Sequence, residues 1–113
     1  MIWVNFAKKY LAAFAAKDLD TLDSEIYADD VVLSDWLATA NGKEQVLIAN
    51  KHLFNNCDMI SIHIQNIAYN NKTIFVHFDL ILTNGSEKTD LSVVDIIEIN
   101  DRGRIKTITA FKK

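Results

Sequence analysis

One acidic residue stands in the middle of an otherwise apolar row of side chains. The stretch Leu91–Ile99 is rich in β-branched residues and has a turn signal at each end, which is typical of a β-strand. Because side chains alternate between the faces of a strand, Asp95 shares its face with apolar residues such as Val93 and Ile97. Burying an unpaired carboxylate costs several kcal/mol, so we expect Asp95 to be neutral, paired or used in chemistry.

Two further residues have side chains suited to the same chemistry. Tyr10 places one hydroxyl on the apolar face of a predicted amphipathic helix, and Asp35 stands at the end of a predicted short strand, Val31–Asp35. Structural roles are open for all three residues. Asp95 fits a buried acid bonded to Tyr10 or to backbone amides, Tyr10 a core tyrosine with a satisfied hydroxyl, and Asp35 a loop acid or a helix cap.

Hydrophobic periodicity predicts the elements that must position these side chains. Helices are expected over residues 2–16, over a short stretch after Asp18 or Asp20, and again after Asn41-Gly42, with a loop over Trp36–Asn41. The pattern then changes from helical spacing to alternation. Strands are predicted at Met59–Tyr69, Lys72–Thr83, Leu91–Ile99 and Arg104–Phe111.

This order of elements predicts an α+β fold in a single domain covering residues 1–113. Three helices come first, with one short strand among them, and four long antiparallel strands follow as a meander. Such strands curl by their own twist, and a curled sheet leaves a pocket wherever the helices do not fill its concave side. We expect Asp95 to point into that space.

Composition narrows the classes of function. The chain has 113 residues, half of them apolar, a net charge of −3 and one cysteine, Cys57. The charge argues against nucleic-acid binding, and no apolar run approaches the length of a membrane span. A single cysteine allows no internal disulfide and favours a reducing compartment. Because Lys8 and Lys9 interrupt the apolar N-terminus, we expect no signal peptide and a cytoplasmic location.

The sequence predicts neither a metal nor a cofactor. His63 and His77 lie on strand faces away from the apolar rows, where surface or dimer-interface positions are expected, and no cluster of ligands accompanies them. Cys57 fits a small buried apolar residue. The glycines stand at turns or at a helix start, so no phosphate-binding loop is present.

Three stretches carry a resemblance to a known family. They are Tyr10-Leu-Ala-Ala-Phe-Ala-Ala-Lys-Asp18-Leu-Asp20, Tyr27-Ala-Asp-Asp-Val-Val-Leu-Ser-Asp35, and Val94-Asp95-Ile96 running into Gly103-Arg-Ile-Lys-Thr-Ile-Thr-Ala-Phe111. The chain resembles the nuclear-transport-factor-2-like superfamily, in particular its SnoaL-like and ketosteroid-isomerase branch. The resemblance implies a cone-shaped, curved, mixed or antiparallel sheet wrapped around three N-terminal helices, and it implies a homodimer.

The resemblance also implies roles for specific residues. Asp35 stands where the isomerases place a catalytic base, and Tyr10 and Asp95 stand where they place two neutral donors that stabilise an enolate oxygen. Tyr27 matches a tyrosine that supports the oxyanion donor in some members. The pattern departs from the isomerases at Trp36, where they usually have proline, and near Asn50, where they have a tyrosine.

The expected ligand is a small apolar molecule that contains a carbonyl group. Residues expected to contact it are Phe14, Tyr27, Trp36, Phe54 and Val93. The expected activity is proton transfer beside the carbonyl, as in a ketosteroid-isomerase-like enzyme or a SnoaL-like cyclase. The alternative is a non-catalytic ligand-binding or dimerisation module of the same superfamily.

Two other activities of the superfamily fit the sequence less well. Epoxide hydrolysis needs an Asp-Arg-Asp set, and the only arginines, Arg102 and Arg104, lie in and after a predicted hairpin turn. A dehydratase needs paired histidines inside the cavity, and the strand parity of His63 and His77 places them elsewhere.

Overall fold

The computed structural model describes residues 2–113. These residues form three helices, one π-helical turn, η1, and six strands, of which the last four follow the third helix. The helical elements are α1 (Ile2–Ala15), α2 (Leu19–Thr21), η1 (Leu22–Ile26) and α3 (Lys43–Asn55). The strands are β1 (Tyr27–Ser34), β2 (Thr39–Asn41), β3 (Met59–Asn70), β4 (Thr73–Asn84), β5 (Glu87–Ile99) and β6 (Ile105–Lys112).

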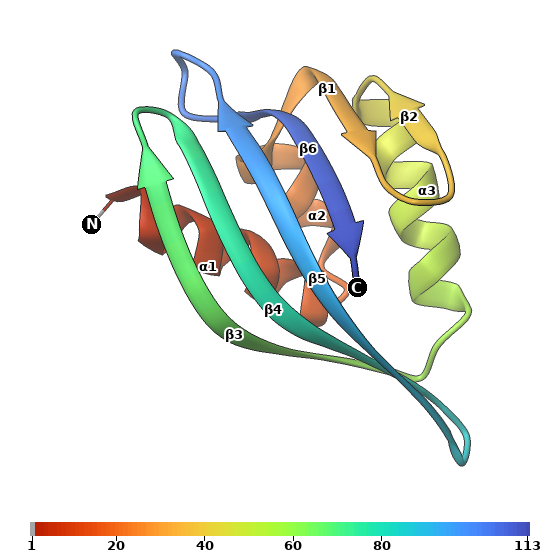
Figure 1. Cartoon of the computed structure of the whole chain (residues 1–113). Coiled ribbons are helices and arrows are strands. Elements are labelled where there is room, and N and C mark those ends of the chain that lie inside the picture. The colour runs from red at the N-terminus through yellow and green to blue at the C-terminus, as the bar shows by residue number, and fades with distance from the viewer. Residues whose placement is uncertain (1) are drawn as a thin grey trace.

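The six strands form one curved, mixed sheet in the order β2-β1-β6-β5-β4-β3. Among the strands of residues 2–113, only the β1–β6 pair is parallel, because the chain crosses from the helical half back to the end of the meander. Figure 1 shows α1 and α2 against one face of the sheet and α3 beside β1 and β2. Irregular register between Ile64 and Asn66 and between Glu98 and Ile99 adds local twist. The predicted α+β architecture with a curved sheet around three helices is confirmed.

The stretch predicted as a loop after Asp35 is a hairpin instead. Thr39–Asn41 pairs antiparallel with the end of β1 as strand β2. The Asp35 carboxylate closes the turn, because its Oδ1 accepts hydrogen bonds from the backbone N–H groups of Leu37 at 2.8 Å and Ala38 at 2.9 Å. A three-residue strand is too short to produce a detectable alternation, so periodicity could not reveal it.

Strand β1 also begins earlier than the sequence indicated, at Tyr27 instead of Val31. Its first residue pairs with Ile105 of β6, so the parallel partner sets the true start. Sequence patterning does not contain that information, because the two segments are far apart in the chain. The earlier start places the Tyr27 side chain, which is 1% exposed, inside the fold.

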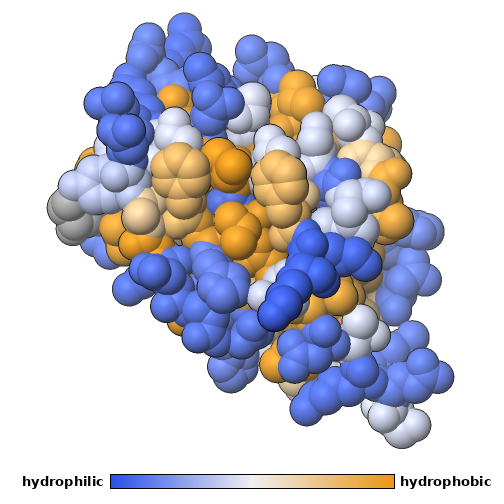
Figure 2. Space-filling view, viewed as in Figure 1, coloured by the Kyte–Doolittle hydropathy of each residue, from blue (hydrophilic) through white to orange (hydrophobic). Residues whose placement is uncertain are grey.

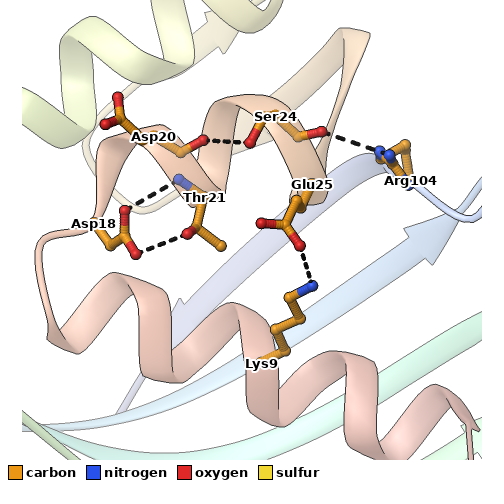
Figure 3. A network of polar contacts seen from close by, with 7 residues as sticks. All are labelled: Lys9, Asp18, Asp20, Thr21, Ser24, Glu25 and Arg104. Carbon is orange, nitrogen blue, oxygen red and sulfur yellow. Dashed lines mark hydrogen bonds and ion pairs between the residues drawn. The ribbon is translucent and has the colours of Figure 1, made fainter.

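Polar contacts fix the segment that leads into β1 (Figure 3). Asp18 caps α2 through Thr21, and the Ser24 hydroxyl donates to the Asp20 carbonyl at 2.7 Å. Lys9 of α1 forms an ion pair with Glu25 at 2.6 Å. These contacts are exposed or partly buried, so each adds little stability, but together they orient η1 between α1 and the sheet.

The apolar core lies between α1, η1 and the inner face of the sheet. Its centre consists of fully buried aliphatic side chains: Leu22, Ile26, Ile74, Ile97 and Ile105. Along β5 the buried positions are Val93, Asp95, Ile97 and Ile99, which confirms the predicted inward row with one acid in it. The core is therefore continuous on both sides of Asp95.

Candidate functional site

A cavity of about 500 Å³ lies between α1, α3 and the inner face of the sheet. The helices cover only part of that face, since α1 packs on β3 and β4 while α3 packs on β1 and β2. Most of the wall is apolar. The sheet contributes Leu33, Ile62, Phe78, Leu80, Leu82, Leu91, Val93, Ile108 and Ala110 to it, and the helices contribute Leu11, Phe14, Ala49 and Leu53.

Asp95 is the buried acid in the wall of this cavity. It is 4% exposed and lies between Val76 of β4 and Ala110 of β6, its direct neighbours across the sheet. Within residues 2–113, no group forms a hydrogen bond or an ion pair with its carboxyl. Burial raises the pKa of Asp95 from 3.8 to about 7, because the apolar surroundings penalise the charged form. Near neutral pH the carboxyl is therefore present in both protonation states.

Two buried tyrosines stand beside this acid. The ring centroids of Tyr10 and Tyr27 are 6.2 Å apart, and the Tyr27 hydroxyl donates a 2.6 Å hydrogen bond to Oδ1 of buried Asn50. Burial raises the pKa of Tyr10 well above its usual value, and the neighbouring Tyr27 and Asp95 raise it further. Burial likewise raises the pKa of Tyr27. Both hydroxyls therefore stay neutral and can act as hydrogen-bond donors.

Asp35 lies at the mouth of the cavity and is exposed. Its Oδ1 is occupied by the two backbone bonds that close the β1–β2 turn, while no hydrogen bond within residues 2–113 uses Oδ2. The same turn brings Trp36 and Leu37 to the mouth, and the Lys112 ammonium lies 5.5 Å from the centroid of the Trp36 ring. Asp35 therefore closes a turn and also presents a carboxylate oxygen beside the cavity.

The three residues predicted to carry the chemistry, Tyr10, Asp35 and Asp95, all line this one cavity. Of the five residues expected to contact a ligand, Phe14, Trp36 and Val93 also line it. The other two lie behind the wall and support it. Tyr27 packs against the ring of Tyr10, and Phe54 packs edge-on against Phe14 with centroids 5.2 Å apart.

Two polar residues at the cavity were not singled out from the sequence. His52 lies on α3 with Ala49 and Leu53, Asn56 follows directly after the helix, and all four line the cavity. These residues are spaced as on one face of a helix, which the sequence shows. The sequence did not show which face of α3 borders a cavity and which borders the core.

The remaining candidate residues lie outside the cavity. Neither arginine lines it, and Arg104 instead reaches the Ser24 carbonyl at 3.5 Å. His77 contacts the Ser92 hydroxyl at 2.9 Å through Nε2, while His63 is paired with Asp79 across the β3–β4 ladder. No group of three or more His, Cys, Asp or Glu side chains between residues 2 and 113 is arranged to hold a metal ion. No helix in the same range is long and apolar enough to cross a membrane.

Comparison with known proteins agrees with this architecture. Residues 7–108 match the sequence profile of the SnoaL-like domain. Among solved structures, a Shewanella denitrificans protein named for its similarity to SnoaL-like polyketide cyclases superposes with a TM-score of 0.88 at 14% identity, covering 99% of this chain and 90% of its own. An M. tuberculosis epoxide hydrolase resembling LEH superposes with a TM-score of 0.86 at 18% identity, covering 98% and 82%.

A third similar structure has no known function. A protein of unknown function related to NTF-2, from Burkholderia xenovorans, superposes with a TM-score of 0.78 at 15% identity, covering 98% of this chain and 82% of its own. Identities this low establish the shared fold only. Among curated proteins, no sequence matches this chain significantly.

The raised pKa of Asp95 leads to a prediction about stability. Between about pH 4 and pH 7 the unfolded chain has lost this proton and the folded chain has kept it, so the wild-type protein becomes less stable as the pH rises. The full effect is roughly 4 kcal/mol. We expect the Asp95→Asn variant, which cannot ionise, to gain free energy of unfolding relative to wild type by an amount of that order across this range.

Urea unfolding of both proteins at a series of pH values measures this difference. The Asp90→Asn variant is the control, because Asp90 is an exposed acid on the same strand. The difference in free energy of unfolding between this variant and wild type is expected to change little over the same pH range. Parallel curves for wild type and Asp95→Asn would mean that Asp95 titrates normally in the folded protein.

Proposed function

Because the chain belongs to the SnoaL-like domain family, we propose that its cavity binds a small apolar carbonyl compound and moves a proton on the carbon beside the carbonyl. One observation carries this proposal above the others. A carboxyl group that is 4% exposed and has no hydrogen-bond partner within residues 2–113 lies in the wall of an apolar cavity, beside a tyrosine hydroxyl. Because this carboxyl lines the cavity and bonds to no protein group there, it is available to a polar atom of a ligand.

The carbonyl oxygen is held by the two neutral donors. The Tyr10 hydroxyl and the protonated Asp95 carboxyl each donate a hydrogen bond to it. As the neighbouring C–H bond breaks, negative charge develops on that oxygen, and both hydrogen bonds become stronger in the transition state. The apolar wall keeps water away, so the donors need not compete with solvent.

The base in this proposal is Asp35. Its free Oδ2 takes the proton from the carbon beside the carbonyl, which leaves an enolate. Return of the same proton to a different carbon completes an isomerisation. In a cyclisation, the enolate carbon instead attacks a second carbonyl of the same molecule, and the new alkoxide takes the proton. Neither route needs a metal ion, a redox partner or any other co-reactant.

Loss of the base predicts loss of proton transfer. With 2-tetralone in D₂O, wild-type protein is expected to accelerate exchange of the hydrogens beside the carbonyl, as followed by NMR. Asp35→Asn is expected to lower the rate by about 10²-fold or more, since the amide cannot accept the proton. Exchange by wild type no faster than in buffer would contradict catalysis and favour the non-catalytic binding module.

The protonation state of Asp95 predicts the pH profile of the same reaction. Only the neutral carboxyl donates, so kcat/KM of the wild type is expected to fall as the pH rises through about 7, where Asp95 loses its proton. Asp95→Asn retains a neutral N–H donor at every pH. Its profile is expected to lack this fall, with a lower rate below pH 7. The same fall in both proteins would assign it to another group.

A second feature, on the opposite face of the sheet, supports the dimerisation alternative. Exposed Phe75, Val94 and Phe111 are joined there by half-buried Ile96, and strand register places these residues side by side. Figure 2 shows this apolar area in the middle of the sheet face, surrounded by hydrophilic residues. Exposed patches of this kind mark interaction sites. We propose a second copy as the partner, because two uncharged patches meet about a twofold axis without repulsion.

One charge at the centre of this patch is expected to separate the dimer. Val94→Lys places an ammonium where two apolar surfaces would meet, so sedimentation velocity is expected to show a dimer for wild type and a monomer for the variant. Ile48→Lys is the matched control, because Ile48 is exposed on α3, away from this face. A wild-type protein that is monomeric at tens of micromolar would contradict the homodimer.

A further inference from the structure

The cavity is lined by acidic side chains but by no lysine or arginine of residues 2–113. Within this range, Asp95 and Asp35 are the acids that line it. Lys112 lies near the mouth, because its ammonium is 5.5 Å from the centroid of the Trp36 ring. A buried acid in an apolar wall, with no lysine or arginine of residues 2–113 lining the same cavity, can serve as the counter-ion of a cationic ligand.

We infer that the cavity also accepts a lipophilic ammonium ion, with Asp95 as its counter-ion and the apolar wall around its hydrocarbon part. This inference goes beyond the proposed function, because it needs binding and no turnover. It also implies that carboxylate-bearing ligands of the same shape are excluded, since they would bring a third negative charge into the cavity.

Pre-organisation favours the cation. A buried ion pair is usually weak because both partners must be desolvated, but folding has already removed Asp95 from water. The ligand then contributes only its own desolvation. The pKa of about 7 supports this, since a large part of the carboxyl is already ionised at neutral pH. A bound cation would stabilise that form.

The groups near Asp95 suit an ammonium. Tyr10 of α1 presents a hydroxyl oxygen that can accept a hydrogen bond, and Asn50 of α3 also lines the cavity. The rings of Tyr10 and Phe14 line it too, and aromatic faces attract cations.

Few other titratable groups face this part of the wall. From α1 and β1 they are Tyr10 and Tyr27, which stay neutral; the residues directly across the sheet are Val76 and Ala110. Asp35 and His52 lie at the mouth.

Three probes of the same shape and different charge test the inference. They are cyclohexylmethylamine, which stays protonated to about pH 10 as lysine does, cyclohexylmethanol, which is neutral, and cyclohexanecarboxylate, which is anionic. Titration calorimetry at about pH 8 is expected to show the amine binding roughly tenfold or more tightly than the alcohol, with no binding of the carboxylate. Lowering the pH to about 5.5 is expected to weaken binding of the amine by about tenfold or more and to leave the affinity for the alcohol unchanged.

A second measurement on the wild type does not depend on any variant. At about pH 6 most of Asp95 is protonated, so an ammonium that pairs with the carboxylate must displace nearly one proton. Calorimetry in buffers with different ionisation enthalpies measures that release. The alcohol is expected to release none.

Variants assign the effect to one carboxyl. Asp95→Asn is expected to abolish the preference for the amine while keeping the affinity for the alcohol, and Asp90→Asn is expected to keep both. Equal binding of amine and alcohol at pH 8, failure of the amine to bind at millimolar concentration, or a preference lost in Asp35→Asn but kept in Asp95→Asn would each overturn the inference. A protein that catalyses exchange but shows no charge preference refutes this inference alone, and an inactive protein that prefers the amine refutes only the proposed function.

Discussion

The burial of Asp95 without a hydrogen-bond or ion-pair partner in residues 2–113 is the constraint on which the rest of this structure depends. Its neighbours across the sheet, Val76 and Ala110, offer no polar group, so the carboxyl can meet only the cavity and the tyrosine beside it. A chain selected for stability alone would place an aliphatic residue at this position of the inward row. The cavity lies where the helices leave this acid uncovered, and Tyr10 and Asn50 line the same cavity.

The helical half of the chain serves to bring hydroxyl and amide groups to this acid. The π-helical turn η1 ends directly at Tyr27, and the contacts of Lys9 and Asp20 fix that turn against α1 and the sheet. Tyr27 then supports the ring of Tyr10 and is itself held by Asn50 of α3. Three separate elements thus meet at one point, so the positions of the donors depend on tertiary packing rather than on any single helix.

The sequence predicted the parts of this arrangement that leave a periodic signal. The inward row of β5 and the apolar stripe of α1 have such signals, and so Asp95 and Tyr10 could be picked out. The hairpin at Thr39–Asn41 was predicted as a loop, because a side chain of Asp35 closes it and three residues show no period. Which face of α3 borders the cavity was likewise not predictable, because curvature of the sheet decides it.

The pKa of Asp95 relates the two proposed ligand classes to each other, because each class binds a different protonation state of the carboxyl. Because the pKa of Asp95 is about 7, both its neutral and its ionised form are present at neutral pH, and each class of ligand binds the form that it requires. Binding of a carbonyl favours the neutral acid and raises the pKa of Asp95 further, whereas binding of an ammonium favours the carboxylate and lowers that pKa. Carbonyl and ammonium compounds would then compete for one site with opposite pH dependence. A partner cation built into the wall would have removed that choice, and none lines the cavity within residues 2–113.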